Sequence, residues 1–382
     1  MPLPQGAPSV PLVRRNRSPR LLRFDSSFVA IIAFIALLHA VGWTTLIAFV
    51  APLHPGAGSK ALGIGVGLTA YTLGMRHAFD ADHIAAIDNT TRKLVGEGKR
   101  TLSVGFWFSF GHSSIVFALT LLIALGVHSL TSRVADAGSA FHSLSSVFGA
   151  TVSSGFLYLI AALNLFAFLD IYKVFRQSKS GRHDEARLAQ RLEQRGFISR
   201  LIAPLMRIVR TPAQMVFVGV LFGLGFDTAT EIALLVLTGS GAASGLPWYA
   251  TLCLPVLFAA GMLLFDTLDG SFMNFAYGWA LARPVRRIYY NLVVTGLSVV
   301  VALVIGSVEV LGVLDHALKP RGAFWSWTSN LDPSNVGFVI VGLFVATWAV
   351  SFAIWKLGRI DERSTPAYTD SPTPNHHLEQ SP

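Results

Sequence analysis

Residues 62–87 read LGIGVGLTAYTLGMRHAFDADHIAAI, an apolar stretch that ends in a dense group of ionisable side chains. A helix crosses the ~30 Å hydrocarbon layer of a membrane with roughly 20 apolar residues, so this stretch is long enough to span it. Four ionisable groups fall within seven positions: His77, Asp80, Asp82 and His83. A charged carboxylate at the bilayer centre costs about 2.5–3.5 kcal/mol even on the lenient insertion scale, so such groups indicate function. The stretch predicts a membrane helix that carries a functional site.

The composition of the whole chain agrees with a membrane protein. Of its 382 residues 52% are hydrophobic and 13% are charged, and the mean hydropathy is +0.55. Soluble domains carry about 25% charged residues, so an ordinary soluble enzyme, a disordered protein and a nucleic-acid binder are excluded. The net charge of +9 fits the basic cytoplasmic loops of a membrane protein rather than nucleic acid as a partner. The single cysteine, Cys253, provides neither a disulfide framework nor a thiol cluster for a soft metal.

Eight apolar stretches have the length of a membrane helix, and none shows the alternating pattern of a β-barrel strand. The sequence therefore predicts an all-α polytopic membrane protein with eight transmembrane helices. Residues 23–360 form its transmembrane domain, with spans at about 28–50, 62–87, 102–127, 147–172, 213–238, 248–278, 290–314 and 335–356.

The distribution of lysine and arginine predicts the orientation of these spans. Basic residues gather before the first span, in the loops after the second, fourth and sixth, and after the eighth, whereas the alternate loops are poor in them. By the positive-inside rule both termini lie in the cytoplasm, with the lipid bilayer around the spans. The tails 1–22 and 361–382 are predicted to be disordered, and linker 176–212 to hold an amphipathic helix at the membrane surface.

Helical geometry constrains how the groups of 62–87 can act together. At 100° per residue, His77, Asp80 and His83 share one face, whereas Asp82 points elsewhere. Asp82 can join them only where the helix is locally unwound, as broken helices are at transporter sites.

The other spans contribute further polar groups. Six carboxylates in the predicted spans are singled out as candidates, with Arg76 as the nearby fixed cation: Asp80, Asp82, Asp227, Glu231, Asp266 and Asp269. The excess of acid requires bound protons, a wet cavity or a cation from outside. Helix 5 adds Thr230 beside Glu231, helix 3 adds His112, and helix 1 adds His39, which by itself fits a hydrogen-bonded structural histidine. Imidazole and carboxylate without thiolate are typical of a divalent-metal site.

Four of these segments, in order, resemble the signatures of the nickel/cobalt transporter (NiCoT) family. The core His77, Asp82 and His83 is similar to its helix 2 signature, and the Gly-His-Ser of residues 108–116 to its helix 3 motif. Residues 224–232, LGFDTATEI, and 261–270, GMLLFDTLDG, resemble its helix 5 and helix 6 motifs.

The resemblance implies a single-subunit secondary permease that takes up Ni²⁺ or Co²⁺ across the bacterial cytoplasmic membrane. It implies metal recognition by His77, Asp80, Asp82 and His83. Secondary contacts or a translocation path would come from His39, His112, Asp227, Thr230, Glu231, Asp266 and Asp269. The metal would be cargo rather than a permanent cofactor, and an ATPase subunit is not expected, since the chain has no P-loop motif.

Two other functions compete with uptake. A nickel/cobalt efflux pump would use similar ligands, but exporters of this kind often carry a long His-rich loop, and linker 176–212 holds only His183. A membrane metalloenzyme would need a motif such as HExxH, which the spans lack. The sequence therefore favours a transporter that is not an enzyme, and it defines no oligomeric state. We expect His77→Ala and His83→Ala to abolish transport, and Glu231→Gln to be milder than Asp82→Asn.

Overall fold

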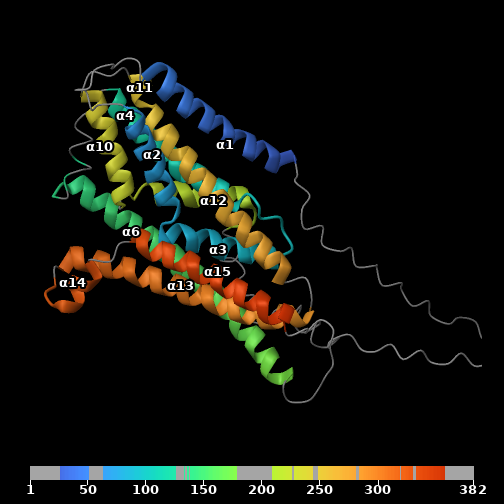
Figure 1. Ribbon diagram of the computed structural model, residues 1–382. Coiled ribbons are helices and arrows are strands. Elements are labelled where there is room, and N and C mark those ends of the chain that lie inside the picture. The colour runs from blue at the N-terminus through green and yellow to red at the C-terminus, as the bar shows by residue number, and fades with distance from the viewer. Residues whose placement is uncertain are drawn as a thin grey trace, which may run out of the picture. The chain divides into compact units, whose positions relative to one another are not determined.

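The computed structural model describes most of the chain, and in the described residues the secondary structure is helical, with no strand (Figure 1). The described ranges are 26–50, 63–125, 133, 136, 138–178, 209–225, 228–243, 248–280, 284–318, 320–329 and 333–357. The chain divides into one compact unit of residues 1–341 and a second of residues 342–382, whose described part is the end of the last helix. The predicted tails, most of linker 176–212 and Asp227 lie outside the described residues.

Most of the helices coincide with the predicted apolar stretches. The longer ones are α1 (Ser26–Thr44, continued by a π-helical turn to Val50), α4 (Val104–Ala124), α6 (Ala140–Ser178), α12 (Cys253–Ala280), α13 (Pro284–Leu318) and α15 (Pro333–Leu357). The shorter ones are α2 (Ile64–Ala78), α3 (Ala81–Gly96), α9 (Met215–Gly223), α10 (Ala229–Ala243), α11 (Trp248–Thr251) and α14 (Ala323–Ser329). Among the described residues five helices are long and apolar enough to cross a membrane, which confirms an all-α, multi-pass membrane fold. The count of eight spans and the cytoplasmic termini stay predictions.

The predicted second span is not one continuous helix. Helix α2 ends at Ala78, Phe79 caps it with φ −89° and ψ 16°, and Asp80 turns into extended backbone with ψ 143° before α3 begins. The carboxylate of Asp80 accepts a hydrogen bond from the backbone N–H of Ala81 at 2.9 Å, so this acid is the N-cap of α3. An aspartate in this role satisfies a backbone donor that a helix start leaves free. The prediction that His77, Asp80 and His83 share one face of a straight helix is therefore wrong.

The predicted fifth span is interrupted in the same way. Helix α9 ends at Gly223 and α10 begins at Ala229, and the described residues between them, Leu224, Gly225 and Thr228, are not helical. The first interruption falls at the Phe-Asp pair of positions 79–80. These breaks explain why neither predicted span forms one helix long enough to cross the membrane.

Helix α12 is the centre of the packing and contacts α1, α2, α3 and α4, while α13 packs against α6 (Figure 1). Glycines allow the closest crossings. A Cβ at Gly74 or Gly261 would overlap backbone across the α2–α12 contact, and one at Gly111 or Gly219 would do so between α4 and α9. In a membrane, where lipid is as apolar as a side chain, such small residues let helices approach and gain packing contacts. The two broken helices are thereby held close to α4 and α12.

Candidate metal site

Three histidines from three helices meet inside the helical bundle. His77 is in the last turn of α2, His83 in the first turn of α3, and His112 in the middle of α4. Their side chains are 1–3% exposed, and one ligand atom from each lies within 4.8 Å of the others. The ring centroids are 4.6–4.8 Å apart for every pair. The break between α2 and α3 makes this possible, because it lets both ends of the interrupted helix face α4.

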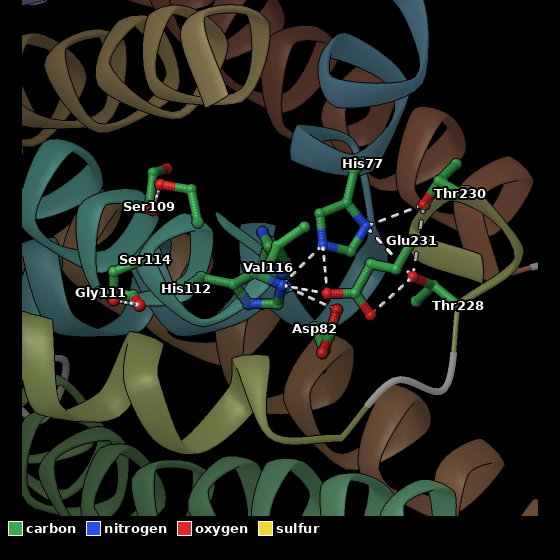
Figure 2. Close-up of polar contacts among 12 residues, drawn as sticks. His77, Asp82, Ser109, Gly111, His112, Ser114, Val116, Thr228, Thr230 and Glu231 are labelled. Atoms are coloured by element: carbon green, nitrogen blue, oxygen red, sulfur yellow. Dashed lines mark hydrogen bonds and ion pairs between the residues drawn. The ribbon is translucent and has the colours of Figure 1, made fainter. Parts of the chain in front are cut away.

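A carboxylate from the second broken helix completes the cluster. The Nε2 atoms of His77 and His112 are 2.9 Å apart, and Oε1 of Glu231 is 2.7 Å from Nε2 of His112 and 3.8 Å from that of His77. Figure 2 shows the two imidazoles and this carboxylate pointing toward one another. Two ligand atoms that bind a first-row metal ion at ~2.0–2.1 Å and at right angles lie roughly 2.9 Å apart. The separations of His112 Nε2 from His77 Nε2 and from Glu231 Oε1 match the spacing of neighbouring ligands on one ion.

Polar groups lie next to the Nδ1 atoms of two of the imidazoles. Nδ1 of His77 lies 3.0 Å from the hydroxyl of Thr230 and 3.3 Å from that of Thr228 (Figure 2). Nδ1 of His83 lies 3.5 Å from Oδ2 of Asp266, which accepts a hydrogen bond from Ser109. Metal-binding histidines commonly engage one ring nitrogen in this way, and the other is left for the ion.

The ends of the broken helices add to the electrostatics. The C-terminal end of α2, which carries the negative end of the helix dipole, lies at the cluster and favours a cation. The N-terminal ends of α3 and α10 carry the positive end, but each has an acid in its first turn, Asp82 and Glu231 respectively. The arrangement suits a divalent cation held by neutral imidazole and one or more carboxylates.

The acids predicted in the second span also have partners outside the cluster, although Asp82 lies beside His112 and Glu231 in Figure 2. Asp80 is the N-cap described above. Oδ1 of Asp82 accepts from the backbone N–H of His83 at 2.8 Å, and Oδ2 accepts from the hydroxyl of Ser153 on α6 at 3.3 Å. The same hydroxyl lies 2.9 Å from Oε1 of Glu309 on α13. Asp80, Asp82 and Asp266 all interact electrostatically with His83, so they shape its surroundings.

His39 and Asp269 have partners outside the histidine cluster. Nδ1 of His39 is 2.8 Å from the carbonyl oxygen of Ile35 and Nε2 is 3.3 Å from the hydroxyl of Tyr71, which is the structural role that the sequence favoured. Asp269 is one turn beyond Asp266 on α12 and interacts electrostatically with it. Asp227 lies outside the described residues.

Several functional groups were missed in the sequence. Thr228 and Ser109 carry no signal as single hydroxyls, since their role depends on contacts between helices. Glu309 did have a signal, as an acid within the predicted span 290–314, but it was not among the six carboxylates. Arg92, placed in a loop by the sequence, instead lies on α3, where it is 8% exposed and donates to Thr295 at 2.9 Å.

Fold and site together define a multi-pass α-helical membrane protein with a buried histidine–carboxylate cluster at two broken helices. A family model described as "High-affinity nickel-transport protein", of the NicO family, matches residues 63–354. The chain belongs to this family, which confirms the resemblance to the nickel/cobalt transporters.

Relatives of known name agree with the family. The chain is 56% identical to nickel transporter NicT of Mycobacterium tuberculosis, over 88% of this chain and 90% of the relative. It is 41% identical to nickel transporter NixA of Staphylococcus aureus, over 88% and 96% of the two chains. It is 38% identical to cobalt transport protein NhlF of Rhodococcus rhodochrous, over 84% and 89%. No solved structure matches the chain.

Proposed function

We propose that this chain takes up Ni²⁺, Co²⁺ or both across the bacterial cytoplasmic membrane, as a secondary transporter without an enzymatic activity of its own. The ion is the transported substrate, and it binds among His77, His83, His112 and Glu231. The observation that carries this proposal is the convergence of three buried imidazoles, with one ligand atom of each within 4.8 Å. The relatives named for nickel and for cobalt support these two ions as the substrates.

The donor set supports discrimination against the abundant magnesium ion. Imidazole nitrogen suits nickel and cobalt, whereas magnesium prefers carboxylate, carbonyl and water oxygens and keeps much of its hydration. Three nitrogens in a buried site therefore favour a transition metal over magnesium. Because a ligand imidazole must be neutral, protons compete with the ion, and acid weakens its apparent affinity.

The two broken helices support transport rather than storage. Interrupted helices place backbone carbonyls and helix ends around an ion near the bilayer midplane in several transporter folds. Here both interruptions adjoin the histidine cluster, through His77 and His83 on one side and Thr230 and Glu231 on the other. Small movements of the half-helices can open the site to either side of the membrane.

Accumulation of radiolabelled nickel or cobalt in cells that express the chain tests this proposal. We expect accumulation above empty-vector cells at nanomolar metal with millimolar magnesium present, because the imidazole site excludes magnesium. Cells that express an equal amount of the His77→Ala variant serve as the control and should match the empty vector. Accumulation below the empty-vector level would indicate efflux, and no change with the protein in the membrane would contradict transport.

A further inference from the structure

The helix break at Phe79 and Asp80 is held from outside by α15. A Cβ at Gly337 would overlap the carbonyl oxygen of Phe79, and it would lie 2.8 Å from the carbonyl carbon of Phe79 and 3.2 Å from the backbone nitrogen of Ala81. Real Cβ atoms essentially never come this close to backbone, and the backbone cannot rotate away as a side chain can. Only glycine allows α15 to lie against the break at this distance.

The neighbouring residue of α15 holds the side chain at the break. The ring of Phe338 stacks on that of Phe79 with a centroid distance of 4.8 Å and an interplanar angle of 24°. Phe79 also contacts Phe265 of α12, with a centroid distance of 5.5 Å. The ring of Phe79 thus contacts both α15 and α12.

The break determines where two of the imidazoles lie. His77 is two residues before Phe79 and His83 is four residues after it, while His112 and Glu231 are carried by α4 and α10. A shift of the break therefore moves His77 and His83 relative to the other two ligands. Metal–ligand distances are met within about 0.2 Å, so even a small shift changes the affinity. Nickel and cobalt differ in their preferred coordination geometry, so a shift of the break changes their relative affinity as well.

We propose that Gly337 and Phe338 are positioning residues of the metal site. They set the helix break, and through it the geometry in which His77 and His83 meet the ion. They do not touch the ion, and they act on the affinity and on the ratio of cobalt to nickel transport. This inference rests on the proposed function, because it assumes that the histidines bind the substrate.

The test compares Gly337→Ala with Gly342→Ala, a control on the same helix where an added Cβ meets nothing within 4 Å. Uptake kinetics for both ions are measured at equal membrane abundance. The absorption bands of bound Co²⁺ are recorded on the purified full-length protein. We expect Gly337→Ala to raise the KM by about 10-fold or more, as loss of an outer-shell contact does. It should also change the cobalt:nickel ratio and the Co²⁺ bands, while Gly342→Ala changes none of them.

Phe338 provides an independent variant in case the Gly337 variant does not accumulate. Phe338→Leu should raise the KM and alter the Co²⁺ bands. Phe338→Tyr, which keeps the ring, should have the KM and the Co²⁺ bands of the wild type. An unchanged KM, ion ratio and spectrum would overturn the inference, and so would a lower maximal rate alone, which indicates a general packing role. The Co²⁺ bands of the wild type are also compared with those of His83→Ala. Identical bands in the two proteins would overturn the proposed site, and this inference with it.

Discussion

Replacing His83 with alanine is expected to abolish high-affinity uptake of nickel, with a loss of apparent affinity of at least about 100-fold. The reason is that His83 supplies one of three imidazoles in the cluster and is itself oriented by Asp266. Outer-shell partners alone contribute about 10–100-fold to metal affinity, and a ligand contributes at least as much. The measurement is nickel uptake at nanomolar concentration, divided by the amount of protein in the membrane. His77→Ala is expected to have the same effect.

The control for these variants is a histidine outside the cluster. His142 lies in the first turn of α6 and is partly exposed, and His142→Ala should leave uptake within about twofold of wild type, because substitutions away from buried networks usually have small effects. The membrane level of all three variants should stay near that of the wild type. High-affinity accumulation that persists in His83→Ala would rule out this cluster as the transport site.

Glu231→Gln is expected to lower uptake nearly as strongly as loss of a histidine, although it replaces only one carboxylate oxygen with an amide nitrogen. The side chain of Glu231 is 1% exposed, and Oε1 lies within 4 Å of Nε2 in both His77 and His112. Glutamine keeps the shape but removes the negative charge that offsets the charge of a divalent ion in a buried site. We expect a rise in the KM of about 100-fold.

Asp82→Asn is expected to be the milder of the two, with an effect below about 10-fold. The carboxylate of Asp82 accepts from the backbone of His83 and from Ser153, and asparagine keeps one acceptor oxygen. This order reverses the expectation from sequence, which assigned metal recognition to Asp82 and an accessory role to Glu231. Uptake kinetics of both variants at equal abundance decide between the two orders, and a greater loss in Asp82→Asn would support the sequence-based assignment.

The fold could be predicted from sequence because its determinants are local. The length and apolarity of each stretch identify helices such as α4 and α12, and the positions of their ends follow from the same pattern. For the predicted span 62–87, the sequence indicated a local unwinding of the helix only as the condition under which Asp82 could join the site. In the structure Asp80 lies at this break, and its carboxylate caps α3.

The candidate site was predictable in its residue types but not in its partners. His77, His83 and His112 all stood out as intramembrane histidines, yet nothing along the chain indicates that Glu231 lies within hydrogen-bond distance of His112. That choice depends on how α10 lies against α2 and α4, which are separated from it by more than 100 residues. The buried position of Arg92 depends likewise on α13 and its Thr295.

The most direct test of the central claim is X-ray absorption spectroscopy at the nickel edge, on purified full-length protein loaded with one equivalent of Ni²⁺. The account predicts scattering from three imidazole rings and at least one carboxylate oxygen, with metal–ligand distances near 2.0–2.1 Å. One imidazole should disappear from the spectrum of the His112→Ala variant. A shell of oxygen atoms alone, or a spectrum that His112→Ala leaves unchanged, would contradict binding at this cluster.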